Sequence, residues 1–241
     1  MSTTPAPFRR AHSPEQREVR RQTILRSAAE MLAEMPVADL SLNELSRRVG
    51  LAKSNVLRYF ETREAVLLEV LDSAWRVWLA RLADELPAAV AADADLTTRY
   101  ERLAGTIAGA VVADPLLWEL ISVSAAVLER NVSPEAARRY KITATANIRE
   151  LGRLTRAHLP ELAEEGAFHF AGAGLLAIGA VWPLAHPSAA MRQVYDAPDM
   201  TDLRLDGPAT LREVLTTVLA GCLRRWPIDR PIADQRERPP T

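Results

Sequence analysis

Side chains that donate hydrogen bonds are concentrated between residues 53 and 59. They are Lys53, Ser54, Asn55, Arg58 and Tyr59. Lysine and arginine suit the acceptors of guanine, asparagine suits adenine, and hydroxyls and cations suit phosphate oxygens. Val56 and Phe60 recur among these donors at helical spacing, which gives the segment an apolar side. We therefore expect a helix that lies in the major groove of DNA, with Lys53, Asn55 and Arg58 contacting base edges.

The residues just before this segment have the pattern of a short helix followed by a tight turn. Ser41 and Glu44 form a capping box, in which the two side chains bond to backbone N–H groups at a helix start. The apolar residues that follow at helical spacing are Leu42, Leu45 and Val49. Gly50 ends the helix, and glycine adopts the positive φ of a tight turn without steric cost. The pattern predicts a helix-turn-helix.

Two longer helices are predicted on either side of the helix-turn-helix. Ser13, Pro14 and Gln16 mark a helix start, and an apolar stripe then runs from Ile24 to Met35. A further helix begins near residue 62 and continues to Pro87 without a helix breaker. We expect a three-helix DNA-binding domain over residues 13–61, preceded by a flexible basic tail, residues 1–12.

With these residues in place, the first third of the chain resembles the tetracycline-repressor (TetR) family of transcriptional regulators. The matching stretches are residues 24–32, 42–51, 53–60 and 61–65, which follow one another in the register of the family. The resemblance implies a cytoplasmic homodimer that binds double-stranded DNA at a palindromic operator, commonly as a repressor. It also implies a second, variable helical domain that binds an unknown small-molecule effector.

Two positions depart from the family pattern. Ala52 stands where serine or threonine is usual, and the missing side-chain cap costs about 1 kcal/mol. Leu57 stands where tyrosine is usual, so Tyr59 is assigned the phosphate contact and Leu57 a thymine methyl. The other expected phosphate contacts are Ser41, Arg47, Ser54 and Arg63. Ser41 and Arg63 are chosen because they lie at helix starts, whereas a free surface arginine is an equal alternative for Arg47.

The distribution of charge agrees with one DNA-binding end. The net charge of the 241 residues is −1. Residues 1–60 hold ten Lys and Arg against six Asp and Glu, whereas the other 181 residues hold 20 against 25. A basic end attracts phosphate and predicts binding that weakens with salt. The arginines at 9, 10, 17, 20 and 21 either contact phosphate or lie on a solvated face.

The remainder of the chain predicts an all-α fold of about nine helices in total. Apolar periodicity and proline positions mark helices near 96–112, 115–130, 134–158, 160–184 and 208–226. Residues 185–207 are expected to be a loop and 228–241 a flexible tail, so that 62–227 form a ligand-binding and dimerisation domain. The apolar run 170–185 falls short of the ~20 residues that span a bilayer, which favours a buried helix and no membrane partner. The single cysteine, Cys222, suits a reducing cytoplasm.

The last two predicted helices have the composition of a dimer surface. One is rich in glycine and alanine, and the other carries an apolar stripe. The residues expected at the interface are Gly172, Leu176, Gly179, Leu211, Leu215, Val218 and Cys222. Pairing both helices with their symmetry mates would form a four-helix bundle. The alternative is that they pack only within one chain.

A ligand pocket is expected between the fourth helix and the helices that begin at 96, 115 and 134. Its expected residues are Trp78, Tyr100, Trp118, Thr143 and Asn147. An apolar cavity with a few polar groups suits a small molecule. The alternatives are that the aromatics are ordinary core and that the two polar residues face water. A fourth helix over 63–86 would be about 36 Å long, so a small tilt would change the separation of the DNA-reading helices.

An enzyme is the rival class, and the residues argue against it. The four histidines are scattered, and no nucleophile motif or phosphate-binding glycine loop occurs. Glu165 and His169 share a helix face, but two ligands do not make a metal site. No cofactor and no metal are therefore expected. A second alternative is a DNA-binding dimer without a small-molecule sensor, either constitutive or regulated by a protein partner.

Overall fold

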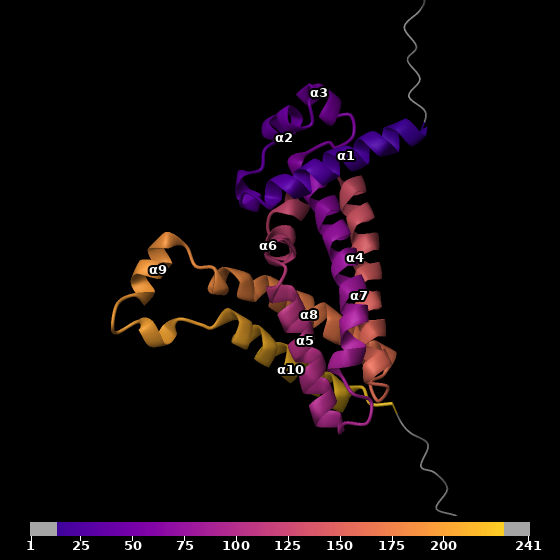
Figure 1. Cartoon of the computed structure of the whole chain (residues 1–241), viewed down its shortest axis with the longest axis vertical. Coiled ribbons are helices and arrows are strands. Elements are labelled where there is room, and N and C mark those ends of the chain that lie inside the picture. The colour runs from indigo at the N-terminus through magenta and orange to yellow at the C-terminus, as the bar shows by residue number, and fades with distance from the viewer. Residues whose placement is uncertain (1–13, 229–241) are drawn as a thin grey trace, which may run out of the picture. The chain divides into compact units, whose positions relative to one another are not determined.

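The computed structural model describes residues 14–228, and within them it contains ten α-helices and no β-sheet (Figure 1). The predicted all-α class is confirmed. The predicted tail 1–12, the cap Ser13 and nearly all of the tail 228–241 lie outside this range. The chain divides into two compact units, Met1–Val70 and Leu71–Thr241, which are described separately.

Unit 1 is a small helical domain. It contains α1 (Pro14–Leu32), a 3₁₀ helix η1 (Val37–Asp39), α2 (Leu42–Arg48), α3 (Lys53–Val56) and the first turns of α4 (Arg63–Ala89). The predicted stripe of α1 is buried in its core, together with apolar residues from each of the other helices. The buried residues include Ile24, Ala28, Met31, Leu45, Val56, Phe60, Val66 and Leu67.

Helix α3 is shorter than predicted. It ends at Val56, and residues 57–59 form a hydrogen-bonded turn instead of continuing the helix to Phe60. The backbone N–H groups of Arg58 and Tyr59 bond to carbonyls three residues back, on Asn55 and Val56, which is the tighter 3₁₀ pattern of a helix end. Ala52 provides no side-chain cap at the other end, as its residue type predicts.

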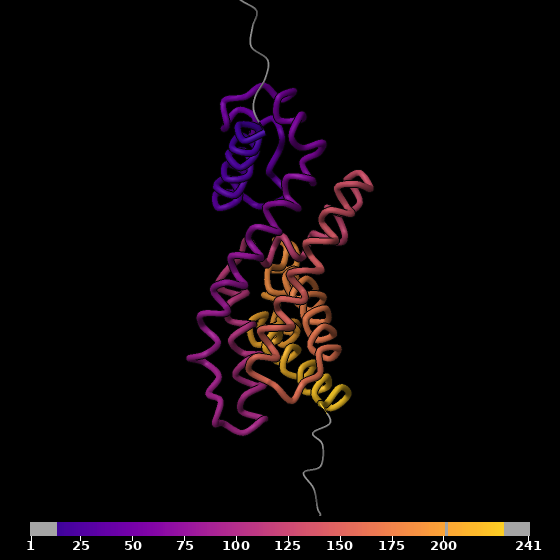
Figure 2. Tube along the Cα trace, turned by 90° about the vertical axis from the view of Figure 1, so that its right-hand side faces the viewer, coloured from indigo at the N-terminus to yellow at the C-terminus, as the bar shows by residue number. Residues whose placement is uncertain are grey.

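Unit 2 contains the rest of α4 and six further α-helices. These are α5 (Leu96–Val112), α6 (Pro115–Ser124), α7 (Pro134–His158), α8 (Glu164–Ala185), α9 (Ala189–Tyr195) and α10 (Gly207–Arg225), with short 3₁₀ helices η2 (Leu128–Asn131) and η3 (Thr201–Leu203). Helix α8 packs against α6, α7 and α10, and α10 also packs against α5 (Figure 2). The core of unit 2 therefore surrounds α8.

Of the helix starts after residue 90 predicted from proline, those at Pro115, Pro134 and Pro208 agree with the structure, and the one at Pro160 does not. Asp114 and Ser133 cap α6 and α7, each accepting a hydrogen bond from a backbone N–H three residues later. Pro160 does not begin a helix, because residues 161–163 pair instead with residues 226–228. The Ala163 N–H donates to the Trp226 carbonyl at 3.0 Å, and α8 begins only at Glu164.

Three further boundaries differ from the prediction. Helix α4 continues past Pro87 to Ala89, and the Val90 N–H still bonds to the Leu86 carbonyl. Helix α6 ends at Ser124, after which η2 turns Leu128 into the core. The expected loop 185–207 contains α9 and η3, which extend away from the other helices of unit 2 (Figure 1).

Among the described residues, α8 is the one helix that by itself is long and apolar enough to cross a membrane. Helices α5 and α6 would meet the same criterion only if they formed one span, but the chain bends by 92° between them. Phe170, Ile178 and Val181 of α8 are buried within unit 2. A core helix passes the same test of length and composition, and one third of the apolar stretch of α8 is buried inside the chain.

Candidate DNA-binding face and ligand cavity

A glycine turn fixes the geometry between α2 and α3. Gly50 has φ +66°, the left-handed conformation that a side chain disfavours. The Leu51 N–H donates to the Ser46 carbonyl at 2.9 Å, and the Gly50 N–H donates to the Arg47 carbonyl at 3.2 Å. These two bonds form a Schellman motif, which ends α2 and directs the chain into α3.

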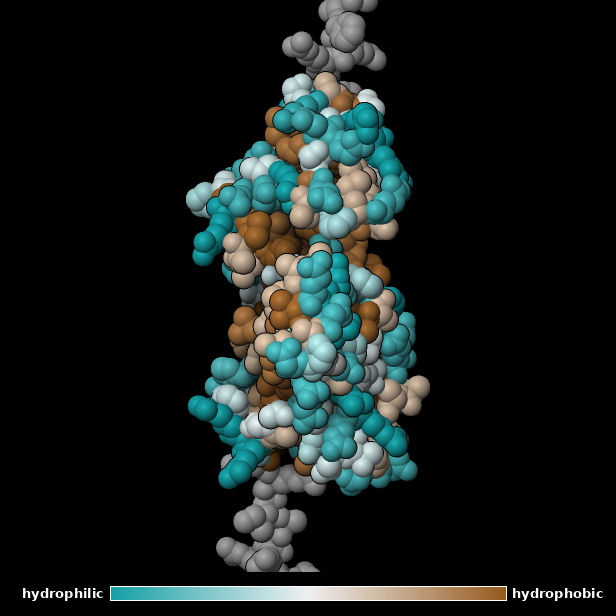
Figure 3. Space-filling view, turned by 90° about the vertical axis from the view of Figure 1, so that its left-hand side faces the viewer, coloured by the Kyte–Doolittle hydropathy of each residue, from teal (hydrophilic) through white to brown (hydrophobic). Residues whose placement is uncertain are grey.

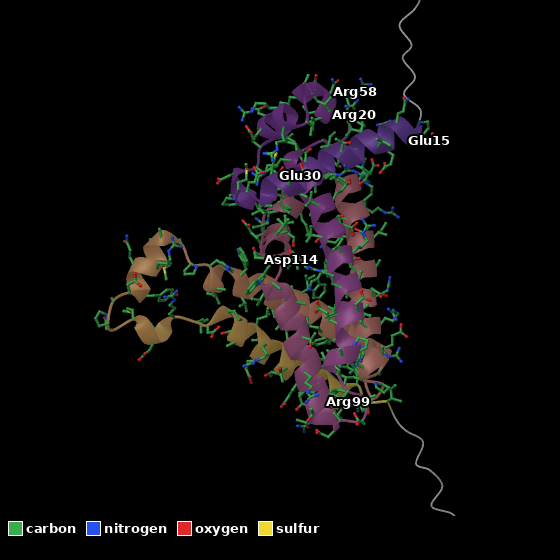
Figure 4. All side chains as sticks on the ribbon, in the orientation of Figure 1. Glu15, Arg20, Glu30, Arg58, Arg99 and Asp114 are labelled. Carbon is green, nitrogen blue, oxygen red and sulfur yellow. The ribbon has the colours of Figure 1, made fainter. Side chains whose placement is uncertain are left out.

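The donors predicted to contact bases lie on the surface of unit 1. Lys53, Ser54 and Asn55 on α3 are exposed. Arg58, directly after α3, is exposed too (Figure 4). None of these four side chains has a hydrogen bond or an ion pair within residues 14–228. Buried Val56 and Phe60 face the opposite way, into the core. The segment therefore presents donors that are not engaged within their own chain.

The residues predicted to contact phosphate are in several different environments. Ser41 caps α2 by accepting a bond from the Glu44 N–H at 3.2 Å. Arg47 Nη2 donates to both oxygens of the Glu44 carboxylate, at 2.5 and 2.7 Å, and this pairing raises the pKa of Arg47. Arg63 is half-buried and donates to the Val37 carbonyl at 2.8 Å. Arg47 and Arg63 are thus already engaged within unit 1.

Arginines of α1 lie over the aromatic residues that follow α3. The Arg17 guanidinium lies 6.0 Å from the centre of the Tyr59 ring, and that of Arg21 lies 5.5 Å from Phe60. Arg21 also pairs with Glu69 on α4. Arg20 is exposed on α1 (Figure 4), whereas Arg9 and Arg10 lie outside the described residues. These contacts hold Tyr59 half-buried beside α1.

A small apolar cavity lies among five helices of unit 2. Its lining residues are Trp75 and Trp78 of α4, Val111 of α5, Leu117 and Ile121 of α6, Leu151 of α7, and Leu175 and Ile178 of α8. Its volume is about 10 Å³, barely enough for one water molecule. Because pockets that hold drug-sized ligands measure roughly 300–1,000 Å³, the cavity in this structure is too small for such a ligand.

The five residues predicted for a ligand pocket do not all meet at this cavity. Trp78 lines it. Trp118 is buried, and its indole N–H donates to the Ile178 carbonyl at 2.7 Å. Tyr100 lies near the start of α5, about 16 Å along the helix axis from Val111. The Thr143 hydroxyl bonds within its own helix, to the Tyr140 carbonyl.

Asn147, the fifth predicted pocket residue, belongs to a buried polar cluster. Its Nδ2 donates to Asp72 Oδ1 at 3.0 Å, so it does not face water. Tyr140 lies two turns before Asn147 on the same face of α7, close to Ser124 of α6. Burial, followed by the charges of Glu129 and Asp72, raises the pKa of Tyr140 to about 12. Asp72 and Ser124 were missed from the sequence, although a carboxylate within the apolar start of α4 is a detectable signal.

The predicted dimer residues divide into buried and exposed sets. Leu211, Leu215 and Cys222 are buried inside the chain, where α10 packs against α5 and α8. A Cβ on Gly179 would lie 3.6 Å from the Ile121 carbonyl, so Gly179 faces α6. The side chain of Leu176 is 73% exposed, Gly172 has open space beside it, and Val218 is half-buried.

Gly172 and Leu176 belong to an apolar stripe on the surface of α8. Phe168, Gly172, Leu176, Ala180 and Leu184 recur every four residues, and Phe168 and Leu184 are 40% and 45% exposed. Figure 3 shows apolar residues scattered among hydrophilic ones on the face of the molecule that carries α9. In that region Met191, Val194 and Leu203 are exposed.

No group of three or more metal-ligating side chains occurs within residues 14–228. On α8, His169 Nε2 lies 3.7 Å from Glu165 Oε1, and these two side chains alone do not make a metal site. His169 also stacks on Trp226 at 4.5 Å between ring centres.

Two family models together match nearly the whole described chain. The model described as "Bacterial regulatory proteins, tetR family" matches residues 24–70, and "Tetracyclin repressor-like, C-terminal domain" matches residues 72–225. The chain belongs to the TetR family. It is therefore a transcriptional regulator with a helix-turn-helix for DNA binding, as the sequence resemblance predicted.

Individual relatives agree with this assignment. The transcriptional regulator EthR of Mycobacterium tuberculosis is 38% identical over 53 residues, which cover 22% of this chain and 24% of EthR. A TetR-family regulator from Pectobacterium atrosepticum has a TM-score of 0.54 at 16% identity, over 91% of this chain and all of that one. The fatty acid degradation regulator FadR from Bacillus halodurans has a TM-score of 0.50 at 15% identity, over 83% of this chain and 98% of its own. Both solved structures share the fold of this chain.

Proposed function

We propose that this TetR-family protein is a cytoplasmic homodimeric repressor that binds a palindromic operator and is released by an apolar small molecule. The observation that supports it best is the set of exposed, unpaired donors on α3 and in the turn after it. Such donors lose no intramolecular bond when they contact DNA.

In this proposal the contacts follow from side-chain chemistry. Lys53, Asn55 and Arg58 contact base edges, and Leu57, which is 42% exposed, packs on a thymine methyl. Ser41, Arg47, Ser54, Tyr59 and Arg63 contact phosphates. Arg47 must exchange Glu44 for a phosphate, and Arg63 contributes by the part of its guanidinium that does not bond to Val37.

The apolar stripe on α8 supports the dimer. A second copy of the chain would cover Phe168, Leu176 and Leu184, with Gly172 allowing close approach and Val218 of α10 at the edge. Leu176→Glu should convert the dimer to a monomer in analytical ultracentrifugation at micromolar concentration. Ile142→Glu, which places the same charge at an exposed apolar position on α7, should not. A dimer that persists in Leu176→Glu contradicts this interface.

Release of DNA is proposed to act through α4, which belongs to both units because they divide at Val70 within it. A ligand that binds one conformation of unit 2 more tightly shifts the population toward it. If that conformation separates the two α3 segments differently, the dimer no longer fits both half-sites of its operator.

The experiment is a selection from a pool of random duplexes with the full-length protein. The proposal predicts enrichment of an inverted repeat whose half-sites are one or more helical turns apart, about 10 base pairs per turn. Enrichment of no sequence, or of one without twofold symmetry, would contradict it.

A TetR-family regulator without a small-molecule sensor is the second candidate, and the small cavity of about 10 Å³ is the observation that favours it. The selected operator separates the two. A sensor releases the operator in a shift assay when a binding compound is added. If compounds that bind unit 2 leave the complex intact, the regulator without a sensor is correct.

A further inference from the structure

The cavity and the buried polar cluster of unit 2 have three helices in common. Helix α4 supplies Asp72 to the cluster and Trp75 to the cavity, and α7 supplies Asn147 and Leu151. Helix α6 supplies Ser124 and Ile121. In each helix the two residues are three or four positions apart and therefore share one face.

The polar residues gather on one side of the apolar ones. On α4 and α7 the polar residue comes one turn before the cavity residue, and the two helices run in the same direction (Figure 1). Asp72 and Asn147 therefore lie at the same end of the cavity, and the hydrogen bond between them agrees with this. Tyr140 of α7, whose pKa responds to both Asp72 and Ser124, lies beside them.

At this end of the cavity, two carboxylates lie deeper in the protein than the cations that pair with them. The side chains of Asp72 and Glu129 are 15% and 22% exposed, whereas those of their cationic partners, Arg76 and Lys141, are 66% and 62% exposed. The carboxylates are thus drawn inward and the cations remain in solvent. Because charges interact more strongly in a low dielectric, a cation inside this end would be held more firmly than one at the surface.

The cavity wall adds two features that suit such a ligand. Trp78 is 2% exposed, and its indole N–H has no hydrogen-bond partner although the group is buried. A buried donor without a partner is costly, and a ligand acceptor would relieve the cost. Trp75, one turn from Asp72, presents the ring type that attracts cations best.

We propose that unit 2 binds a lipophilic amine, with its ammonium group at the Asp72, Asn147 and Tyr140 end and its apolar body between Trp75, Trp78 and Leu151. A hydrogen-bond acceptor on the body would take the Trp78 N–H. This inference rests on the proposed function and specifies its effector class. Binding enlarges the small cavity, so the amine selects a form in which the α4 and α7 side chains have separated.

The experiment compares three probes that share one apolar body: 4-phenylbutylamine, 4-phenylbutanol and 4-phenylbutyrate. Each is titrated into the full-length protein at pH 7 by calorimetry, with tryptophan fluorescence as a second readout. The amine should bind about tenfold or more tightly than the alcohol, and the carboxylate more weakly than both. Asp72→Asn, which keeps the shape and removes the charge, should bring the amine and the alcohol to within about threefold of each other.

The matched control is Glu150→Gln, which removes a carboxylate from the exposed Glu150–Arg153 pair on α7 and should leave the preference unchanged. If Asp72→Asn fails to fold by circular dichroism, Glu129→Gln decides, and it should lower the preference at least about threefold. An amine that binds no better than the alcohol, a preference that survives in the deciding variant, or no amine binding up to about 10 mM overturns the inference.

Operator affinity is measured in parallel without any probe. Intact operator binding together with failure of the amine preference overturns this inference alone. Loss of operator binding in the unmodified protein overturns the proposed function instead.

Discussion

Asn147 and Asp72, which are 75 residues apart in the chain, are joined inside unit 2 by a hydrogen bond from Asn147 Nδ2 to Asp72 Oδ1 at 3.0 Å. Asn147 is 6% exposed, so the bond ties α7 to α4 away from water. A bond from an amide to a carboxylate is charge-assisted and therefore stronger than a neutral one.

Asn147→Ala should lower the free energy of unfolding by about 2–3 kcal/mol, because the Asp72 carboxylate keeps its burial and loses this partner. Urea denaturation at fixed protein concentration measures the change. Thr145→Ala is the control, since its exposed hydroxyl bonds only to the Lys141 carbonyl of the same helix. An equal cost for both variants would show that the bond contributes nothing specific.

Gly50→Ala should destabilise the protein by about 1–2 kcal/mol, since the left-handed φ of +66° disfavours any Cβ even though space is available. Gly109→Ala is the matched control. A Cβ there also meets nothing within 4 Å, but Gly109 lies inside α5, so alanine should stabilise by about 0.5–1 kcal/mol. Thermal melts of the two variants should shift in opposite directions, and a shift in the same direction refutes the explanation.

Glu44→Gln should tighten operator binding about three- to tenfold, because it frees Arg47 for a phosphate while keeping a capping-box residue type. The salt dependence of binding should steepen by about one unit of slope. Glu30→Gln removes the same charge from α1 (Figure 4) without releasing Arg47. Fluorescence anisotropy at several salt concentrations distinguishes them, and equal effects would mean that Arg47 does not contact DNA.

Tyr140 should make stability fall as pH rises above 10. Its pKa is about 12 in the folded protein, raised by burial from 10.0, so the unfolded chain loses this proton first and gains stability relative to the fold. The loss begins near pH 10, reaches about 2–3 kcal/mol near pH 12, and is absent below pH 10. Tyr140→Phe should flatten this part of the stability profile relative to the unmodified protein. Identical profiles from pH 10 to 12 would contradict the assignment.

Local signals predicted most of the helices. Asp114 and Ser133, each followed by proline, cap helices through bonds to backbone groups only three residues away, so the local sequence is enough to predict where these helices begin. Pro160 carries a similar signal, but the pairing of residues 161–163 with 226–228 overrides it. A contact between segments so far apart in the chain cannot be read from local spacing.

Periodicity identified buried faces without identifying what covers them. The stripe of α10 that includes Leu211 and Leu215 was expected at a dimer surface, yet α5 and α8 of the same chain cover it. Likewise Trp78 and Trp118 have the same apolar signal. Only the structure distinguishes the one that lines a cavity from the one bonded to the Ile178 carbonyl.

Asn55 and Arg58 are proposed to contact bases in each half of a twofold-symmetric operator. The most direct measurement is the affinity of the unmodified protein and of the Asn55→Ala, Arg58→Ala double variant for the selected duplex and for a scrambled one, at one salt concentration. We predict that the double variant loses about a hundredfold or more in the ratio of the two affinities while keeping its helical circular dichroism. An unchanged ratio would contradict the account.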